Sequence, residues 1–144
     1  MNKKMVIIRI ERNGEGPYKI GNANLWGYRS RERHTTLRHT PSPDWEANPI
    51  RLAWNNADYD DRQLFHFGFK NAKQLNAWFD SKDMRKLVKH HFDIVAVEVE
   101  EEHYYLGNKQ VMYNVKHSRQ LIKRQLADFT NTSQIKKKLL SILE

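Results

Sequence analysis

The chain gathers its candidate anion-binding side chains in the run from Tyr28 to Trp45. The cations of this run are Arg29, Arg31, Arg33, His34, Arg38 and His39. An arginine guanidinium presents a planar pair of donors that fits phosphate, and an aromatic ring beside it can stack on a base at about 1 to 3 kcal/mol. Apolar residues recur in the run at neither the strand nor the helix period, so the cations must face solvent, acidic partners or a polyanion. The run therefore predicts an irregular loop that binds an anion.

Three residues outside this run complete the predicted ligand site. Arg9 and Arg12 close the first predicted strand, and Gln110 lies on a late one. The full predicted set is Arg9, Arg12, Tyr28, Arg29, Arg31, Arg33, Arg38, His39, Trp45 and Gln110. A second interpretation stays open, in which Trp26 and Trp45 only anchor the loop while its arginines pair with nearby carboxylates. Exposed ion pairs contribute only about 0 to 1 kcal/mol each, so they explain the charge poorly.

The composition describes a globular protein with excess positive charge. The 144 residues include 39% hydrophobic and 11% aromatic side chains, which suit one domain with its own core. The formal net charge of +8 favours a nucleic acid, a nucleotide or another polyanion as partner, and it also serves solubility. The absence of cysteine excludes disulfides and thiolate chemistry. No run of the sequence is long and apolar enough for a membrane span or a signal peptide, so we expect a cytoplasmic protein.

The hydrophobic pattern predicts a sheet covered by helices in the first two thirds of the chain. A β-rich run over residues 5–10 ends at a turn with two glycines and a proline, residues 13–17. A second strand covers residues 64–69. Asn71 and Ser81 are expected to cap two short helices, whose apolar residues recur at spacings of three and four. These helices should cover the sheet.

The last third of the chain predicts a β-hairpin and then a helical tail. Residues 92–99 alternate like a half-buried strand, and a tight turn at residues 106–108 predicts a hairpin from Ile94 to Val115. After Ser118 an apolar stripe predicts a helix through Phe129, and a last helix begins at residue 132 or 133. The stripe consists of Leu121, Ile122, Leu126 and Phe129.

Together these elements predict the α+β class. We expect a single domain with an antiparallel sheet, flanking short helices and a C-terminal helical hairpin. Residues 1–115 would form the core domain, and residues 116–144 would form a basic amphipathic tail. The tail could pack on the domain, on a second copy of the chain as a homo-oligomer, or against nucleic acid.

Several short motifs resemble a group of small phage-encoded proteins. The motifs are Arg9-Ile10-Glu11, Gly16-Pro17-Tyr18, Pro41-Ser42-Pro43-Asp44, Phe67-Gly68-Phe69, Gln74-Leu75 with Trp78-Phe79, and Gly107 with Gln110-Val111. The resemblance spans residues 5–115, and the basic tail from Lys116 departs from it. It implies an accessory protein of a phage. Such proteins often counter host defence, and some sequester or degrade nucleotide signals.

A catalytic alternative rests on the order of three residues. Arg9, His39 and Gln110 resemble the order of functional positions in ADP-ribosyltransferase-like folds. That resemblance implies Arg9 at the pyrophosphate, His39 at the ribose, and Gln110 orienting the acceptor or the nicotinamide ribose. Glu is the more usual residue at the last position, which argues against efficient transfer. An enzyme is therefore the less favoured class.

The sequence predicts neither a metal nor a cofactor. The pair His90-His91 and the acidic runs at residues 58–61 and 100–103 lack ligand spacing. His66 lies in an aromatic strand, where a hydrogen-bonded core histidine is expected.

We therefore predict a phage counter-defence protein that binds a phosphate-bearing nucleotide or signalling ligand through the basic loop. The first alternative is a nucleic-acid or nucleoprotein binder, in which the tail lysines Lys136, Lys137 and Lys138 join the central arginines. The second is the ADP-ribosyltransferase-like enzyme, and the third is an inhibitor that docks on a host protein through the tail.

Overall fold

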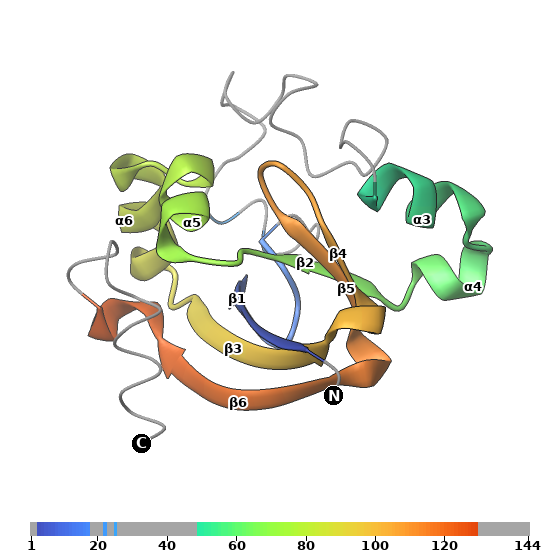
Figure 1. Cartoon of the computed structure of the whole chain (residues 1–144). Coiled ribbons are helices and arrows are strands. Elements are labelled where there is room, and N and C mark those ends of the chain that lie inside the picture. The colour runs from blue at the N-terminus through green and yellow to red at the C-terminus, as the bar shows by residue number, and fades with distance from the viewer. Residues whose placement is uncertain (1–2, 18–21, 23–24, 26–48, 130–144) are drawn as a thin grey trace.

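Two three-stranded sheets organise the chain in the computed structural model, which describes residues 3–17, 22, 25 and 49–129 (Figure 1). The strands are β1 (Lys4–Glu11), β2 (Phe65–Gly68), β3 (Asp93–Glu100), β4 (Tyr104–Leu106), β5 (Val111–Asn114) and β6 (Ser118–Gln125). The α-helices are α3 (Ile50–Asn56), α4 (Tyr59–Arg62), α5 (Ala72–Trp78) and α6 (Ser81–Lys89). The sheets have the orders β1-β3-β6 and β2-β5-β4, and all pairs are antiparallel. The predicted α+β class with antiparallel pairing and short helices is confirmed.

The alternation of strand β1 divides its side chains between two cores. Ile8 and Ile10 belong to a cluster with helices α5 and α6, whereas Ile7 belongs to a cluster with strand β5. Arg9 and Glu11 follow Ile7 along the strand at the same period of two, so they continue the face that meets the second sheet. Both are buried, at 8% and 9% exposure.

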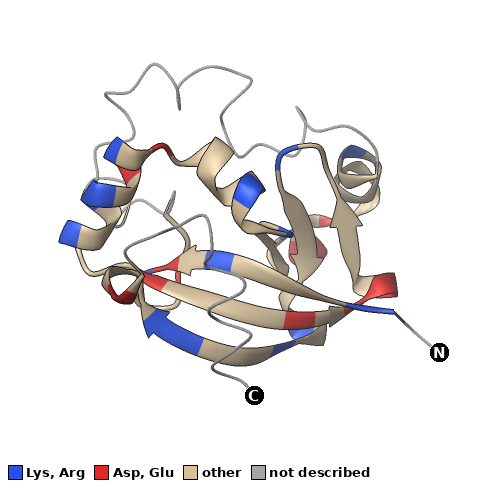
Figure 2. Cartoon of the chain, turned by 60° about the vertical axis from the view of Figure 1, so that its left-hand side comes forward, with Lys and Arg blue, Asp and Glu red and all other residues tan. Residues whose placement is uncertain are grey.

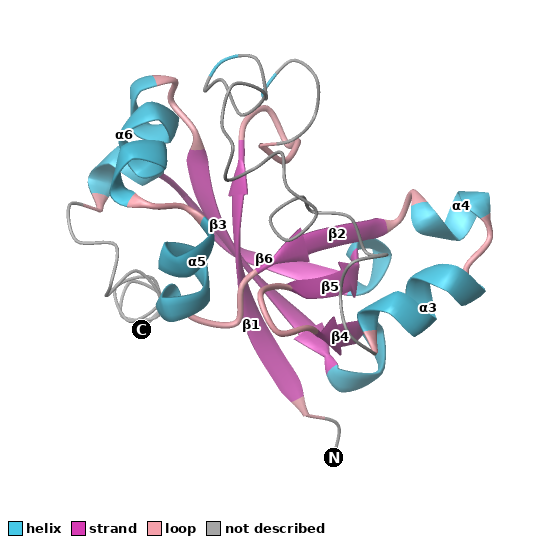
Figure 3. Cartoon of the chain, turned by 90° about the horizontal axis from the view of Figure 1, so that it is seen from above, coloured by secondary structure: helices cyan, strands magenta, loops and turns pink. Residues whose placement is uncertain are grey.

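Helices α5 and α6 cover one face of the first sheet, and α3 and α4 lie together at the opposite end of the molecule (Figure 3). The side chain of Asn71 accepts a hydrogen bond from the Gln74 backbone N–H at 2.9 Å, which confirms the predicted cap of α5. The expected cap of α6 is wrong by one residue. Asp80, rather than Ser81, caps that helix through a reciprocal pair of hydrogen bonds with Asp83.

The two sheets meet where the backbones of Ile8 and Phe69 exchange hydrogen bonds of 2.8 and 2.7 Å. Gly68 permits this approach, because a Cβ atom there would lie 2.6 Å from the Ile8 carbonyl oxygen. The end of β2 is therefore joined to strand β1 by backbone hydrogen bonds, and this bridge connects the two sheets.

The predicted hairpin is correct at its turn and wrong in one arm. Strand β5 pairs with the short strand β4, and the Gly107 backbone N–H donates to the Gln110 carbonyl oxygen at 2.9 Å. Strand β3 pairs instead with β1 and β6 in the other sheet. A 3-10 turn, Glu101–His103, lies between β3 and β4 and ends the first arm before it can pair with β5.

The predicted helix after Ser118 is also wrong, since residues 118–125 form strand β6. Ile122, Leu126 and Phe129 are buried, so the apolar spacing located core positions correctly. Strand β3 is itself buried at residues 94–97, and pairing with β6 satisfies the backbone groups on its second side. The tertiary pairing therefore overrides the helical spacing. The last helix of the predicted helical hairpin lies outside the described residues.

Candidate functional site

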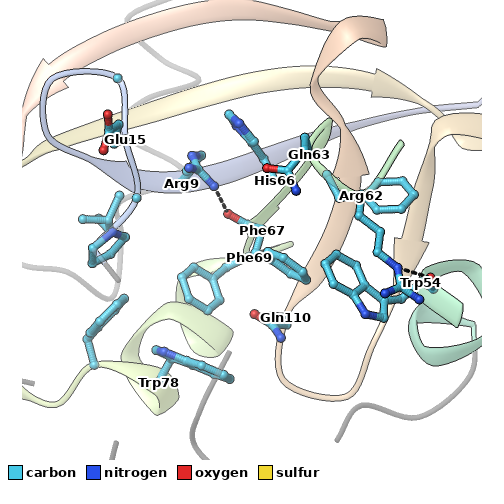
Figure 4. A pocket seen from close by; sticks show the side chains of 16 residues that line it. Arg9, Glu15, Trp54, Arg62, Gln63, His66, Phe67, Phe69, Trp78 and Gln110 are labelled. Atoms are coloured by element: carbon cyan, nitrogen blue, oxygen red, sulfur yellow. Dashed lines mark hydrogen bonds between the residues drawn. The ribbon is translucent and has the colours of Figure 1, made fainter. Parts of the chain in front are cut away.

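A cavity of about 400 Å³ lies between the turn after β1, strand β2, helix α5 and the β4–β5 turn (Figure 4). Its lining residues are Arg9, Ile10, Gly14, Glu15, Gly16, Pro17, Trp54, Arg62, Gln63, Phe65, His66, Phe67, Phe69, Trp78, Phe79 and Gln110. The volume falls in the range of about 300 to 1,000 Å³ that is typical of small-molecule sites. Six of its sixteen lining residues are Phe or Trp, and they stand beside a few polar groups, which is the usual composition of a ligand pocket.

Two groups of rings form the aromatic walls. Trp54 and Phe65 have ring centroids 6.2 Å apart on one side, and Phe69 lies 6.0 Å from both Trp78 and Phe79 on the other. Aromatic side chains hold their geometry with few rotatable bonds, and their faces accept another planar ring. The walls therefore suit a flat, aromatic ligand.

The guanidinium group of Arg9 is fixed at the cavity by two partners. Its Nε atom donates to the Glu11 carboxylate at 2.8 Å, and its Nη1 atom donates to the Phe67 carbonyl oxygen at 2.8 Å (Figure 4). The pair with Glu11 is buried on both sides, and removal of one partner from such a pair leaves an uncompensated charge. Glu11 is therefore a positioning residue for Arg9.

Tyr113 lies beside this ion pair and is 1% exposed. Burial raises the pKa of Tyr113 to about 12, the positive charge of Arg9 acts to lower it, and the negative charge of Glu11 raises it further. The phenol therefore stays neutral at physiological pH. The buried groups next to Arg9 are thus a carboxylate that balances its charge, from Glu11, and a neutral hydroxyl, from Tyr113.

The turn after β1 is held in place by Asn22. Its side-chain amide donates to the carbonyl oxygens of Arg12, Glu15 and Gly16 at 3.0, 3.1 and 3.1 Å. Gly16 faces Arg9 closely, because a Cβ atom there would lie 3.1 Å from the Arg9 Nη2 atom. Asn22 therefore fixes the segment that closes the cavity beside the Arg9 guanidinium.

Arg62 is the second cation of the cavity. Its Nε atom donates to the Trp54 carbonyl oxygen at 3.0 Å, and its guanidinium carbon lies 4.9 Å from the centroid of the Trp54 ring. Within the described part of the chain it forms no ion pair. Its Nη atoms are therefore the uncompensated donors at this site, whereas the charge of Arg9 is balanced by Glu11.

Gln110 brings an amide group into the cavity from the turn between β4 and β5. The side chain is 2% exposed, and its Nε2 atom is buried with no hydrogen-bond partner among the described residues. In the view of Figure 4 the amide lies between the rings of Trp54 and Trp78. Gln74 ties the same turn to helix α5, because its Nε2 atom donates to the Asn108 carbonyl oxygen at 3.4 Å.

The structure brings two of the sequence-predicted site residues together and separates a third from them. Arg9 and Gln110, 101 positions apart in the numbering, line one cavity. Arg12 lies elsewhere, with its Nε atom donating to the His90 carbonyl oxygen at the end of α6 at 3.1 Å. The other seven lie outside the described residues: Tyr28, Arg29, Arg31, Arg33, Arg38, His39 and Trp45. The ADP-ribosyltransferase-like roles of Arg9, His39 and Gln110 stay predictions.

Sequence reasoning missed three residues of this site. Arg62 follows an acidic cluster, where it reads as a surface ion-pair partner, and Asn22 lies between short glycine-containing segments without a pattern. A lone tryptophan such as Trp54 can pack in the core or contact a ligand, and the sequence does not distinguish the two roles. The one available signal was that Arg62 follows Trp54 by eight residues. The stack between the two side chains forms only when the chain turns between α3 and α4.

Helix α6 carries a second group of cations, away from the cavity. Lys82, Arg85, Lys86 and Lys89 recur at spacings of three and four, so they share one face of the helix, which is blue in Figure 2. The opposite face buries Met84 and Leu87. None of the four cations pairs with a carboxylate of the described ranges.

Comparison with known proteins gives an origin for the chain. The sequence model of the Bacteriophage T4 Y00F protein family matches residues 4–127, which include every element described above. The chain belongs to this family. It is thus a small phage-encoded protein, as the sequence motifs predicted, and an accessory function in a phage follows from that origin. Neither a curated protein nor a solved structure matches the chain.

Within residues 3–17, 22, 25 and 49–129, no group of three or more His, Asp or Glu side chains is arranged to hold a metal ion. No helix in these ranges is long and apolar enough to cross a lipid bilayer.

Proposed function

We propose that this phage accessory protein binds a nucleotide in the cavity, with the base between the aromatic walls and the phosphate at Arg62. The observation that carries the proposal is the Arg62–Trp54 stack at the edge of an aromatic cavity. A guanidinium group with free Nη donors beside a stacking ring is a combination that suits a phosphate joined to a base.

Arg9 supports the same ligand in a different way. Its Nη2 atom faces Gly16 in the wall of the cavity, while Nε and Nη1 are held by Glu11 and Phe67. A donor that is already fixed in position gives up little conformational entropy when a ligand arrives. Arg9 therefore serves a sugar or base oxygen better than a phosphate, since its charge is already balanced.

The biological role that we attach to this site is counter-defence. A phage protein that holds a nucleotide signal keeps the signal from its host receptor, and binding alone suffices for that effect. Pro17 and Trp54 line the cavity and flank the sequence interval that contains the basic run. The arginines of that run are thus linked in sequence to the cavity, and their contact with the ligand stays a prediction.

The test is native mass spectrometry of the protein purified under conditions that retain small ligands. We expect a discrete mass shift that matches one nucleotide. In the Arg62→Gln variant the shift should be lost, and binding of added nucleotide should weaken by at least about tenfold. Arg51→Gln is the matched control, because Arg51 is an exposed arginine of α3 that does not line the cavity.

Unliganded wild-type protein that also fails to bind any added nucleotide would contradict the proposal. Equal losses in Arg62→Gln and Arg51→Gln would contradict the cavity as the site, because they would indicate a general effect of surface charge.

The cation face of α6 favours a second candidate, a nucleic-acid binder. Like charges three or four residues apart destabilise a helix by about 0.2 to 0.5 kcal/mol per pair, so an anionic partner would relieve the repulsion. Neutralisation of phosphates releases counterions, which makes such binding steeply dependent on salt. Replacing Lys82, Arg85, Lys86 and Lys89 with Gln should abolish capture of RNA or DNA and leave nucleotide binding in the cavity unchanged. Unchanged capture of RNA and DNA by this variant would exclude the α6 face.

A further inference from the structure

The Gln110 amide is a feature of the cavity that the described fold does not explain. A buried side-chain amide normally makes several hydrogen bonds, and a group without a partner destabilises the protein that carries it. The backbone of Gln110 needs no particular side chain for its own role, which is to accept a hydrogen bond from the Gly107 N–H. A leucine of similar size would fill the space without the unpaired Nε2 atom. The amide therefore points to a partner that is a ligand.

The chemistry of an amide restricts that partner. An amide presents one N–H donor beside one carbonyl acceptor in a single plane, so it pairs best with a planar edge that offers an acceptor beside an amino group. Adenine has this arrangement at N7 and N6, and glutamine is a standard partner for that edge. The aromatic rings on the two sides of Gln110 offer faces on which such a base can stack.

Other bases fit the same environment less well. The N7 edge of guanine offers two acceptors, so the amide carbonyl would face an oxygen. The opposite edge of guanine can pair with an amide, but it brings a further amino group that needs an acceptor in an aromatic wall. Of the other carboxylate and amide side chains that line the cavity, Glu15 and Gln63 are exposed rather than buried, and the guanidinium groups of Arg9 and Arg62 can only donate. Pyrimidines have a single ring and cover less of the two walls.

We infer that the cavity selects adenine nucleotides and that Gln110 determines this selectivity by pairing with the adenine edge. This inference rests on the proposed nucleotide function and goes beyond it. The Arg62–Trp54 stack is equally consistent with a nucleotide site that does not select among bases. Gln110 binds the ligand directly and takes no part in any reaction.

The experiment measures dissociation constants of AMP, GMP and UMP by isothermal titration calorimetry. The proteins are wild type, Gln110→Leu and Gln120→Leu, the last being a matched control because Gln120 is an exposed glutamine of β6 that does not line the cavity. We expect wild type and Gln120→Leu to bind AMP at least about tenfold more tightly than GMP, a difference of about 1.4 kcal/mol. Gln110→Leu should bind AMP and GMP with nearly equal affinity. Purine riboside monophosphate, which lacks the amino group, should bind wild type about tenfold more weakly than AMP.

The outcomes separate the two proposals. If wild type binds the three nucleotides with similar affinity, or if folded Gln110→Leu keeps the preference for AMP, the inference about Gln110 is wrong and the nucleotide function stands. If wild type binds none of them, both proposals fail. The thermal melting temperature of Gln110→Leu without ligand should equal or exceed that of wild type, and a clear decrease would show that the amide has a structural role instead.

Discussion

The two faces of strand β1 differ in what they bury. The face toward helices α5 and α6 is apolar, with Ile8 and Ile10 in one buried cluster with Leu75 and Leu87. The face toward the second sheet begins as an apolar cluster around Ile7 and Tyr113 and then continues as the buried pair of Arg9 and Glu11. Adjacent residues of one strand thus lie in an apolar core and in a buried ion pair, and Arg9 and Ile10 meet at the cavity.

The difference sets two kinds of burial side by side along a single strand. Apolar burial stabilises by roughly 25 cal/mol per Å² and needs no specific partner. A buried ion pair is weak evidence for stability, because the cost of removing both charges from water can exceed their attraction. The pair is therefore better explained by the position that it gives to the Arg9 guanidinium at the cavity.

The largest expected effect comes from breaking the ion pair on one side. Arg9→Met leaves Glu11 buried without compensation and should lower the free energy of unfolding by about 3 to 5 kcal/mol. The double variant Arg9→Met with Glu11→Leu should recover much of that loss, because both buried charges are gone. Urea unfolding of the four proteins of this cycle measures both values. A double variant as unstable as Arg9→Met would mean that the pair itself stabilises the fold.

The helix-covered face should respond to a cavity in its core. Leu87→Ala removes a fully buried side chain and should lower the free energy of unfolding by about 2 to 5 kcal/mol. Because α6 does not line the cavity, folded Leu87→Ala should bind nucleotides with the affinity of wild type. A loss of nucleotide affinity in this variant would show that the two faces are coupled rather than separate.

Comparison of wild type with Tyr113→Phe at alkaline pH should test the face toward the second sheet. An unfolded tyrosine loses its proton near pH 10, whereas Tyr113 keeps its proton in the folded protein because burial raises its pKa to about 12. Its contribution to stability is therefore complete below about pH 10 and is lost as pH rises toward 12, by roughly 2 to 3 kcal/mol. Melting temperatures of wild type and Tyr113→Phe between pH 9 and 12 measure the difference. Parallel curves for the two proteins would show that Tyr113 titrates normally.

The smallest effect on stability is expected at Gly16. An alanine Cβ atom 3.1 Å from the Arg9 Nη2 atom requires the guanidinium to shift by a few tenths of an ångström. We expect Gly16→Ala to change the free energy of unfolding by less than about 1 kcal/mol and to weaken nucleotide binding several-fold, because Arg9 loses its fixed position. Unchanged nucleotide affinity would indicate that Arg9 does not contact the ligand.

The sequence predicted local elements better than their pairing. Strand β1, strand β2 and the Asn71 cap follow from period and capping residues, which act over a few positions. Strand β6 was missed because Ile122 and Leu126 fit a helical spacing, and only the exposed edge of β3 makes a strand the better solution. Long-range pairing of this kind has no local signal.

In the candidate site, too, some residues could be predicted from the sequence and others depend on the folded turns. Arg9 and Gln110 were predicted because their residue types and their order along the chain suit a ligand site, and the structure places both at one cavity. Arg62 and Asn22 depend on a stack and on a set of three carbonyl contacts that form only when the turns are folded. The eight-residue spacing from Trp54 to Arg62 does not by itself predict the stack, and no pattern in the sequence singles out Asn22.

The most direct test of the nucleotide site is a two-dimensional ¹H–¹⁵N NMR titration of the full chain with AMP. We predict chemical-shift changes at the Trp54 indole, the Gln110 side-chain amide and the Gly16 backbone N–H, with Leu87 in α6 unaffected. Changes confined to the cations of α6 and to strand β6, or no saturable change at any residue of the cavity, would contradict the account.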